Sequence, residues 1–185
     1  MTLSIDGIGA LFAGPGRAQY GGEAVSQCEH ALQAAWMASR DGASDALVLA
    51  CLLHDLGHLL FDRHDHLLES GIDDCHEKRI LPLLQSLFPA AVWGPVGLHV
   101  QAKRYLCHVD PHYLAELSPA SRASLVLQGG TMDAAEAQRF IALPHAHDAL
   151  CLRHYDDCAK IVNLAVPDFA HYLPLFAALT KATHQ

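Results

Sequence analysis

The sequence predicts a single all-α domain spanning residues 1–185, and three observations support this prediction. Apolar residues recur at helical spacings of three and four positions, and no stretch alternates convincingly between polar and apolar residues as a half-buried strand does. Residue types that cap helices, and glycines that end them, separate the apolar segments. At 185 residues the chain is also long enough to bury one core without disulfide or metal staples.

The first predicted helices follow a glycine-rich loop, GPGRAQYGGE. The apolar periodicity predicts one helix over residues 23–40, closed by the Asp-Gly pair that comes next. A second helix is expected to begin at a cap formed by Ser44 or Asp45 and to continue to about Phe61. The stretch DRHDHLLESGIDDC is then expected to be a polar connection.

A third helix is predicted over residues 74–88, with a kink or break at Pro82 because proline removes a backbone donor. Residues 88–106 form a fourth helical region that proline and glycine interrupt. Ser118 and the proline after it are typical of a cap followed by the first helical position, and they predict a helix through ASRASLVLQ.

The last third of the chain has equally clear helix signals. Gly129 and Gly130 end the preceding helix, and DAAE, which begins at Asp133, predicts a capping box for a short helix. A long helix is expected over residues 147–165, and a closing helix over residues 169–181.

The composition excludes several classes of function. The formal net charge is −8, from 12 Lys and Arg against 20 Asp and Glu, which argues against binding nucleic acid over an extended surface. No apolar run approaches the roughly 18 residues of a membrane span, and the first residues do not resemble a signal peptide. The six cysteines show no C-x-x-C spacing and are expected to be buried thiols. We therefore expect a cytoplasmic protein with neither a nucleic-acid nor a membrane partner.

Histidine is the unusual residue, with 14 in the chain. The most apolar segment, CLLHDLGHLL, carries His54, Asp55 and His58 within five positions. Burying these polar groups without partners would cost several kcal/mol, on the order of 2–7 for each uncharged group. A metal ion can compensate a neighbouring imidazole and carboxylate together, so this segment predicts a metal site.

Other polar residues in apolar helices extend this prediction. They are His30, His76, His99 and one of Asp156 or Asp157. Each alone is more typical of a core histidine or a solvated carboxylate. Together they provide imidazole nitrogens and carboxylate oxygens on rigid helices, which suits transition-metal binding.

The order of these residues, a His, a His-Asp pair, further histidines and a distant Asp, resembles the HD-domain superfamily. Four stretches, YGGEAVSQCEHALQAA, LLHDLGH, HVQAKRYL and RHYDDCAK, narrow this resemblance. They are similar to the mixed-valent di-iron oxygenases of that superfamily that act on organophosphonates, and myo-inositol oxygenase is a more distant relative. The resemblance covers about residues 15–163. It implies a compact HD-domain helical bundle.

The resemblance also implies a ligand set. Asp55 would bridge two iron ions, and the ligand on the late helix would stand four residues before Lys160, which favours Asp156 over Asp157. The implied metal ligands are His30, His54, Asp55, His76, His99 and Asp156.

Further site residues follow from the same resemblance. Tyr20 would occupy the free position of the second iron until substrate arrives, and Glu23 would receive the substrate's amine. Lys103 and Arg153 would bind the phosphonate, whereas without a metal site they would more often be solvated surface cations. Tyr20, Glu23 and Lys103 are the implied catalytic residues. Additional substrate donors would be His58, Ser121 and Ser124.

The activity implied is organophosphonate catabolism with two iron ions, Fe(II) and Fe(III), and O₂ as co-substrate. The enzyme would cleave the C–P bond of a 1-hydroxy-2-(amino or trimethylammonio)ethylphosphonate to glycine or glycine betaine plus inorganic phosphate. Two alternatives stay open: a metal-dependent HD phosphohydrolase of a nucleotide or phosphate ester, and a metal-bearing regulatory protein without turnover. The residues indicate neither the choice of amine nor the oligomeric state.

Overall fold

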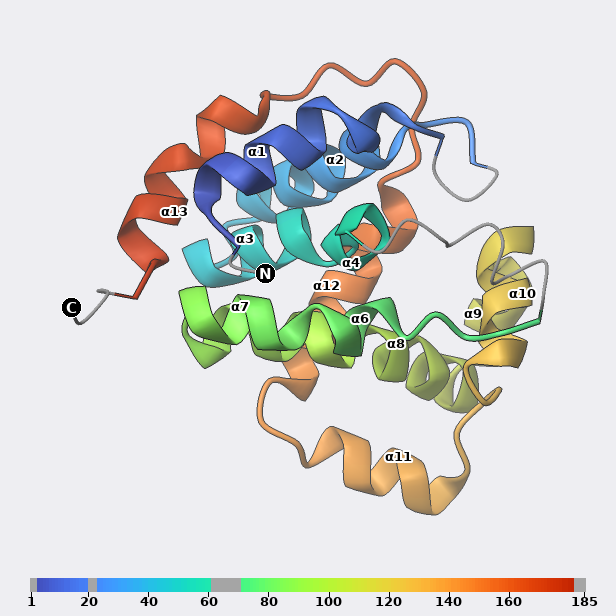
Figure 1. The fold of residues 1–185 in the computed structure, drawn as a ribbon. Helices are drawn as coiled ribbons and strands as arrows, with labels where there is room; N and C mark the ends of the chain where they lie inside the picture. Colours follow the sequence, from blue (N-terminus) through green and yellow to red (C-terminus); the bar gives the residue numbers. More distant parts are fainter. Residues whose placement is uncertain (1–2, 20–22, 61–70, 182–185) are drawn as a thin grey trace.

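The computed structural model describes residues 3–19, 23–60 and 71–181. Within these ranges the regular structure is helical, and the one extended pairing is an isolated bridge between Gln19 and Ser26. The predicted all-α class is confirmed. The chain folds as a set of short helices around a few long ones (Figure 1).

The first helix, α1 (Ile5–Ala13), was not predicted. Ser4 caps it by accepting a hydrogen bond from the Gly7 amide, and Ile8 and Phe12 are buried. A 3₁₀ turn, η1 (Pro15–Arg17), follows within the glycine-rich segment. Because this part of the chain is rich in glycine, which disfavours helices, the sequence did not indicate this helix.

The second helix, α2 (Gln27–Arg40), begins four residues later than predicted. Ser26 accepts from the Glu29 amide while the Glu29 carboxylate accepts from the Ser26 amide, which is a complete capping box. This reciprocal cap fixes the start of the helix that carries His30.

The prediction of one continuous helix up to Phe61 is wrong. Ser44 caps α3 (Asp45–Leu53), as predicted, but the helix stops before His54 and a separate α4 (Leu56–Leu60) follows. Phe61 lies outside the described residues. Every residue of α3 from Leu47 to Leu53 is buried, because several other helices pack against α3.

Pro82 does break the third predicted helix. The result is α6 (His76–Arg79) and α7 (Leu81–Leu87), with Pro82 in the first turn of α7, where its missing amide has no cost. The fourth region is one helix, α8 (Ala90–Val109), with Pro95 inside it. A short α9 (Pro111–Glu116) was not predicted.

Two of the remaining helices begin where capping residues predicted. Ser118 caps α10 (Pro119–Leu127), and Asp133 forms a capping box for α11 (Ala134–Ile141). The next helix, α12 (Ala146–Cys158), is shorter than predicted. The chain closes with η2 (Phe169–Tyr172) and α13 (Leu173–Leu179).

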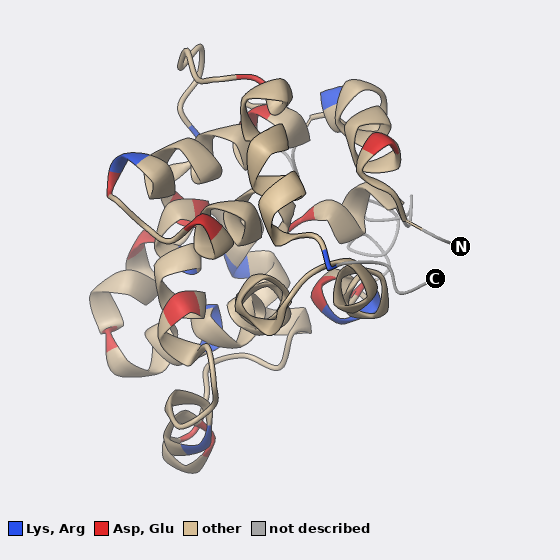
Figure 2. Cartoon of the chain, turned by 90° about the vertical axis from the view of Figure 1, so that its left-hand side faces the viewer, with Lys and Arg blue, Asp and Glu red and all other residues tan. Residues whose placement is uncertain are grey.

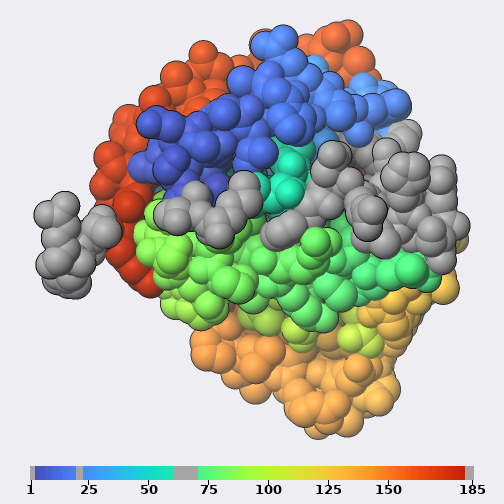
Figure 3. Space-filling view, viewed as in Figure 1, coloured from blue at the N-terminus to red at the C-terminus, as the bar shows by residue number. Residues whose placement is uncertain are grey.

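The core is built around α3, which packs against α2, α8 and α12, and α8 has its most extensive contact with α12. Figure 3 shows α1 and α2 on one side of the molecule, α6 and α7 beside them, and α11 at the opposite edge. Because α2, α8 and α12 all cross near the α3–α4 interruption, residues far apart in sequence meet there.

The surface is acidic on balance. In the side view of Figure 2, Lys and Arg positions of the described residues are interspersed with Asp and Glu positions rather than gathered into one basic face. Among the described residues, no helix is both long enough and apolar enough to cross a membrane.

The cysteine prediction was partly wrong. All six thiols are free, as expected, but only Cys51 and Cys107 are buried, whereas Cys151 and Cys158 are exposed.

Candidate metal centre

The interruption between α3 and α4 carries the His-Asp pair into the middle of the bundle. His54 donates from Nδ1 to the Cys51 carbonyl at 2.8 Å, which fixes its ring at the end of α3. Gly57 lets α4 approach the next ligand, because a Cβ on Gly57 would lie 2.4 Å from the His76 carbonyl oxygen. The glycine in LGH is thus a steric requirement of the site.

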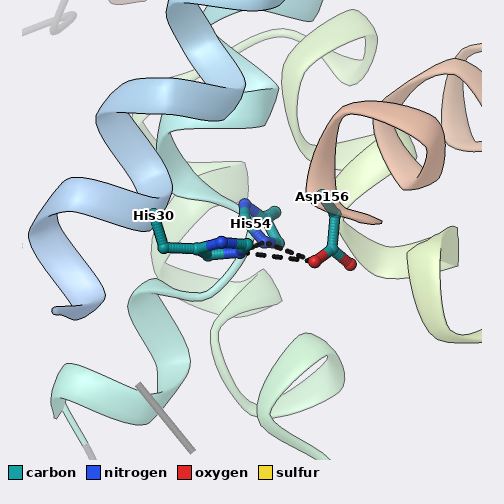
Figure 4. Close-up of side chains that lie close together, drawn as sticks. All are labelled: His30, His54 and Asp156. Atoms are coloured by element: carbon teal, nitrogen blue, oxygen red, sulfur yellow. Dashed lines mark hydrogen bonds and ion pairs between the residues drawn. The ribbon is translucent and has the colours of Figure 1, made fainter. Parts of the chain in front are cut away.

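A first group of ligand-type side chains comes from three different segments (Figure 4). His30 projects from α2, His54 follows α3, and Asp156 projects from α12. The two Nε2 atoms lie 3.2 Å apart, and His30 Nε2 lies 3.3 Å from Asp156 Oδ1. Their exposed fractions are 0%, 0% and 2%, so the group is almost completely buried.

A second group combines Asp55, His76 at the start of α6, and His99 on α8. The Nε2 atoms of the two histidines lie 3.1 Å apart. Asp55 Oδ1 lies 3.3 Å from His76 Nε2 and 3.7 Å from His99 Nε2. These distances fit donors arranged around one point.

Asp55 belongs to both groups. Its Oδ1 faces the second group, whereas its Oδ2 lies 3.4 Å from His54 Nε2 and 3.8 Å from His30 Nε2. One carboxylate oxygen therefore faces each group. This is the arrangement that a bridge between two ions requires.

In all four histidines, a contact at Nδ1, away from the converging Nε2 atoms, fixes the orientation of the ring. Each Nδ1 lies at hydrogen-bond distance from an oxygen that can only accept, so Nδ1 carries the proton and Nε2 keeps its lone pair. The pairs are His30 with the Ala159 carbonyl at 2.9 Å, His54 with the Cys51 carbonyl at 2.8 Å, His76 with Asp74 Oδ1 at 2.9 Å, and His99 with the Val96 carbonyl at 2.7 Å.

The carbonyl that supports His30 is itself held in place. Gln33, buried on α2, donates to the Ile161 carbonyl at 2.8 Å and accepts from the Ile161 amide at 3.0 Å. This two-point contact fixes the segment after α12, including Ala159. The support of the first group therefore extends through backbone that Gln33 fixes.

The converging atoms need a cation. Four imidazole lone pairs point at carboxylate oxygens, and Asp55 Oδ2 and Asp156 Oδ1 are buried with no hydrogen-bond donor among the described residues. Two ligands about 2.1 Å from one ion and roughly at right angles lie about 3 Å apart, which matches the shortest spacings here. The donor set thus fits a metal ion in each group.

The electrostatics agree with this reading. Burial lowers the pKa of His76, but Asp55 and Asp74 outweigh it and raise that pKa to about 10. Burial, joined by the neighbouring His76 charge, lowers the pKa of His99 to about 3. Burial opposes ionisation of Asp55, yet His54 and His58 hold the pKa of its carboxyl well below its usual range. Positive charge is strongly favoured at the centre of this cluster.

A cavity of about 60 Å³ opens onto the second group. Asp55, His76, His99 and Asp156 contribute to its wall, whereas His30 and His54 do not. The predicted substrate residues that line it are Glu23, His58, Lys103, Ser121, Ser124 and Arg153. Tyr20, the remaining one, lies outside the described residues.

Lys103 and Arg153 are not solvated surface cations. Their exposed fractions are 3% and 4%, so that alternative is wrong. Lys103 Nζ donates to Ser124 Oγ at 2.8 Å. Burial, and then repulsion from Arg153, lower the pKa of Lys103 to about 8.

Arg153 is tied to acidic neighbours. Nη1 donates to Asp156 Oδ2 at 2.6 Å, and Nη2 bonds to Asp157. Nε donates to the Tyr113 hydroxyl at 2.9 Å. The structure thus places Asp156 between Arg153 and His30, while Asp157 pairs with Arg153 and accepts from Tyr113. This places Asp156, rather than Asp157, with the other ligand-type residues.

At the other end of the cavity, Glu23 is paired. Lys160 Nζ donates to Glu23 Oε1 at 3.0 Å, and it also lies 3.4 Å from Ser118 Oγ. Burial opposes ionisation, but hydrogen bonds from Ser118 and Lys160 lower the pKa of the Glu23 carboxyl. Glu23 is therefore a carboxylate that already has a cationic partner.

Sequence reasoning missed two residues of the site and the role of a third. Gln128 lines the cavity with a buried carboxamide oxygen that has no donor among the described residues, and Asp74 contacts His76. In the sequence Lys160 helped only to choose between Asp156 and Asp157, and its contact with Glu23 was not predicted. The SGIDDC stretch before His76 was predicted to be a polar connection. The contact of Asp74 with His76 becomes visible only in the folded structure.

Comparison with known proteins gives three relatives and no matching family model. The [1-hydroxy-2-(trimethylamino)ethyl]phosphonate dioxygenase (glycine-betaine-forming) of Leisingera caerulea is 36% identical over 171 residues, covering 92% of this chain and 87% of the relative. Hydroxymethylphosphonate dioxygenase of Gimesia maris is 46% identical over 81% of this chain and 75% of its own. An uncharacterized protein of Acanthamoeba polyphaga mimivirus is 33% identical over 85% of this chain and 73% of its own.

Proposed function

The chain belongs to the family of phosphonate dioxygenases, and from that premise we propose that it uses O₂ to cleave the C–P bond of a 1-hydroxyphosphonate. The substrate proposed is 1-hydroxy-2-(amino or trimethylammonio)ethylphosphonate, and the products are glycine or glycine betaine plus inorganic phosphate. The observation that carries this proposal is the pair of ligand groups bridged by Asp55, beside a cavity walled by the buried cations Lys103 and Arg153.

We further propose that the two groups hold two iron ions in a mixed-valent Fe(II)/Fe(III) state, with O₂ as co-substrate. The proposed ligands are His30, His54, Asp55, His76, His99 and Asp156. Imidazole and carboxylate donors suit iron. When bound, the irons would supply the oxygen chemistry that no side chain in the cavity can perform.

The overall reaction balances with one O₂. The carbon that carries the hydroxyl loses its hydrogen and its bond to phosphorus, and it is oxidised by four electrons to the level of a carboxylate. O₂ accepts these four electrons, and its two atoms are distributed between carboxylate and phosphate. One proton is released. No further reductant is required, which agrees with the absence of any other cofactor from the proposal.

The chain's own residues would bind and orient the phosphonate. Lys103 and Arg153 bring two cationic groups to one wall of the cavity, and Ser121 and Ser124 lie beside them as hydroxyl donors. Burial strengthens these contacts, because charges in a dry site are poorly screened. The C1 carbon would then face the second group, the side on which the cavity opens.

Tyr20 and Glu23 keep their proposed roles at the other end of the substrate. Tyr20 would cap the second ion until substrate arrives, and Glu23 would meet the amine. If Tyr20 binds Fe(III) as phenolate, the resting enzyme will be coloured and Tyr20→Phe will remove the colour. A resting enzyme without such a band would show that Tyr20 does not bind the iron.

A second candidate substrate is hydroxymethylphosphonate, the compound in the name of the Gimesia relative. Two observations favour it: Glu23 already pairs with Lys160, and none of the described residues lining the cavity is Phe, Tyr or Trp. A trimethylammonio group is usually recognised by aromatic faces. Comparing kcat/KM for the three phosphonates, which differ only in the substituent on C1, would separate the candidates.

Oxygen dependence tests the proposed function. Phosphate release from these phosphonates should stop when O₂ is removed and resume when it returns. With ¹⁸O₂, label should enter the carboxylate product. Phosphate release that continues without O₂, with label arriving only from water, would instead support the phosphohydrolase alternative.

A further inference from the structure

Asp74 stands two residues before His76, and its two oxygens contact two different imidazoles. Asp74 Oδ1 accepts from His76 Nδ1 at 2.9 Å and lies 3.3 Å from the His76 amide nitrogen. Asp74 Oδ2 lies 2.8 Å from His58 Nδ1, at ion-pair distance. One carboxylate therefore contacts both a metal-ligand candidate and a residue of the cavity wall.

The two rings are also packed on each other. The centroids of His58 and His76 lie 3.8 Å apart with the planes inclined at 31°. His58 Nε2 points inward, 3.8 Å from Asp55 Oδ1, and His58 lines the cavity. With Asp74 behind both Nδ1 atoms, each ring presents its Nε2 to the centre of the site.

We propose that Asp74 is a positioning residue that fixes the tautomer and orientation of His76 and anchors His58 at the cavity wall. This inference rests on the two-metal centre of the proposed function. It adds that the second metal position depends on a side chain outside the set of six ligands, and that the same side chain couples this position to the cavity.

The supports of the other ligands show why Asp74 matters. His30, His54 and His99 are held by backbone carbonyls, which substitution cannot remove. Among the described Nδ1 contacts of the four histidine ligands, that of His76 is made by a side chain. A single substitution can therefore weaken the second position while the first keeps its supports.

A third ion among His58, Asp74 and His76 is a weaker interpretation, although their ligand atoms lie within reach of one another. His76 Nε2 already faces the second group at 3.1 Å from His99 Nε2. An ion on His76 Nδ1 as well would require that ring to bind through both nitrogens as an imidazolate. A hydrogen-bonded carboxylate accounts for the same contacts without that requirement.

The test is an anaerobic Fe(II) titration of metal-free protein, read by equilibrium dialysis. Asp74→Asn keeps the size of the side chain but turns an N–H toward one imidazole, where only an acceptor fits. We expect the weaker of two binding steps to lose about 10- to 100-fold in affinity while the tighter step stays as in the wild type. Asp73→Asn is the matched control, because the Asp73 carboxylate contacts Cys75 instead. Two unchanged binding steps in Asp74→Asn would overturn the inference.

A second readout does not depend on ion binding. Histidine ¹⁵N spectra of the metal-free wild type, recorded at a pH high enough to leave the His76 ring neutral, should show its proton on Nδ1, and Asp74→Asn should shift part of that population to Nε2. A spectrum identical to that of the wild type would overturn the inference even if the variant were less stable. These measurements involve no turnover, so the Asp74 inference can stand or fall separately from the C–P cleavage activity.

The coupling to the cavity is tested by His58→Ala. This variant should keep both Fe(II) binding steps, because His58 is not one of the six ligands, but raise KM for the phosphonate. Asp74→Asn should affect both ion binding and KM. If His58→Ala leaves KM unchanged, Asp74 does not couple the metal position to the cavity.

Discussion

The two ligand groups have similar donors but different surroundings. The first group, His30, His54 and Asp156, is buried inside the bundle, and only its Asp156 reaches the wall of the cavity. Its histidines are held by backbone carbonyls. The second group supplies Asp55, His76 and His99 to the wall of the cavity, and one of its supports is a side chain. An ion in the first position would be held by side chains that solvent barely reaches. An ion in the second is where incoming molecules would arrive.

The difference follows from the positions of the groups in the fold. α2 and α12 pack against each other and against α3, and His30 and His54 of the first group are fully buried there. α6 is only four residues long and follows an irregular segment, so the second group lies at the border of the packed core. The Asp55 carboxylate therefore lies between a tightly packed first group and a second group that faces the cavity.

The largest effect should come from breaking the link between the groups. Asp55→Asn keeps the shape of the side chain but removes its charge and one of its two acceptor oxygens. Because losing a supporting residue already costs about 10- to 100-fold in metal affinity, loss of the bridge should exceed that range. Metal analysis and phosphate release should both fall to background. A variant that retains two ions per chain would show that Asp55 does not bridge.

Arg153 and Lys103 should differ, although both line the cavity. Arg153→Ala removes the partner of Asp156 and leaves a buried charge, a change that typically costs about 3–5 kcal/mol. It should therefore lower occupancy of the first position as well as phosphonate affinity. Lys103→Ala, whose bond is to Ser124, should weaken phosphonate binding with metal content near wild type. Equal metal content in both variants would contradict the role of Arg153 in holding Asp156.

Gly57→Ala should disturb the second group selectively. The added methyl would meet the His76 carbonyl oxygen at 2.4 Å, so α6 must shift, and overpacking of this kind costs about 1–3 kcal/mol. We expect a lower melting temperature and weaker binding of the second ion. Gly97→Ala is the control, since its methyl would meet flexible Leu81 side-chain atoms at 3.0 Å. Equal ion binding by the two variants would show that the close approach at Gly57 is unimportant.

The smallest effect is on pH dependence. Burial, and then Arg153, lower the pKa of Lys103 to about 8, so the side chain is charged below that pH and neutral above it. Phosphonate affinity should fall as the pH rises through about 8, by at most about tenfold per pH unit for one group. Lys103→Arg keeps its charge throughout and should remove this component. If the wild type and Lys103→Arg show the same pH profile, Lys103 does not titrate in this range.

Local signals in the sequence predicted several helix starts. Ser44, Ser118 and Asp133 cap the helices predicted for them, and Pro82 breaks the chain as expected. The errors lie where contacts with distant parts of the chain, rather than local sequence, determine whether a helix continues. Apolar periodicity continues through His54 and Asp55, yet the helix is interrupted there, and both side chains contact partners from other helices, His30 and His76.

The candidate site was predictable to a similar degree. The six ligand-type residues were proposed from their order and from resemblance, and the fold brings them into two adjoining groups. The Glu23–Lys160 pair and the contact of Asp74 with two imidazoles were not foreseen, because they join segments that no spacing rule relates. Gln128 was passed over as the end of a helix, although its carboxamide faces the cavity.

The metal content of anaerobically purified protein tests the central claim most directly. Iron and protein should be quantified on the same sample after growth with sufficient iron, with Asp55→Asn purified in parallel. We expect two iron ions per wild-type chain and a large loss in the variant. A wild-type protein that binds fewer than one ion per chain, or that binds two ions equally well without Asp55, would contradict a bridged two-metal centre.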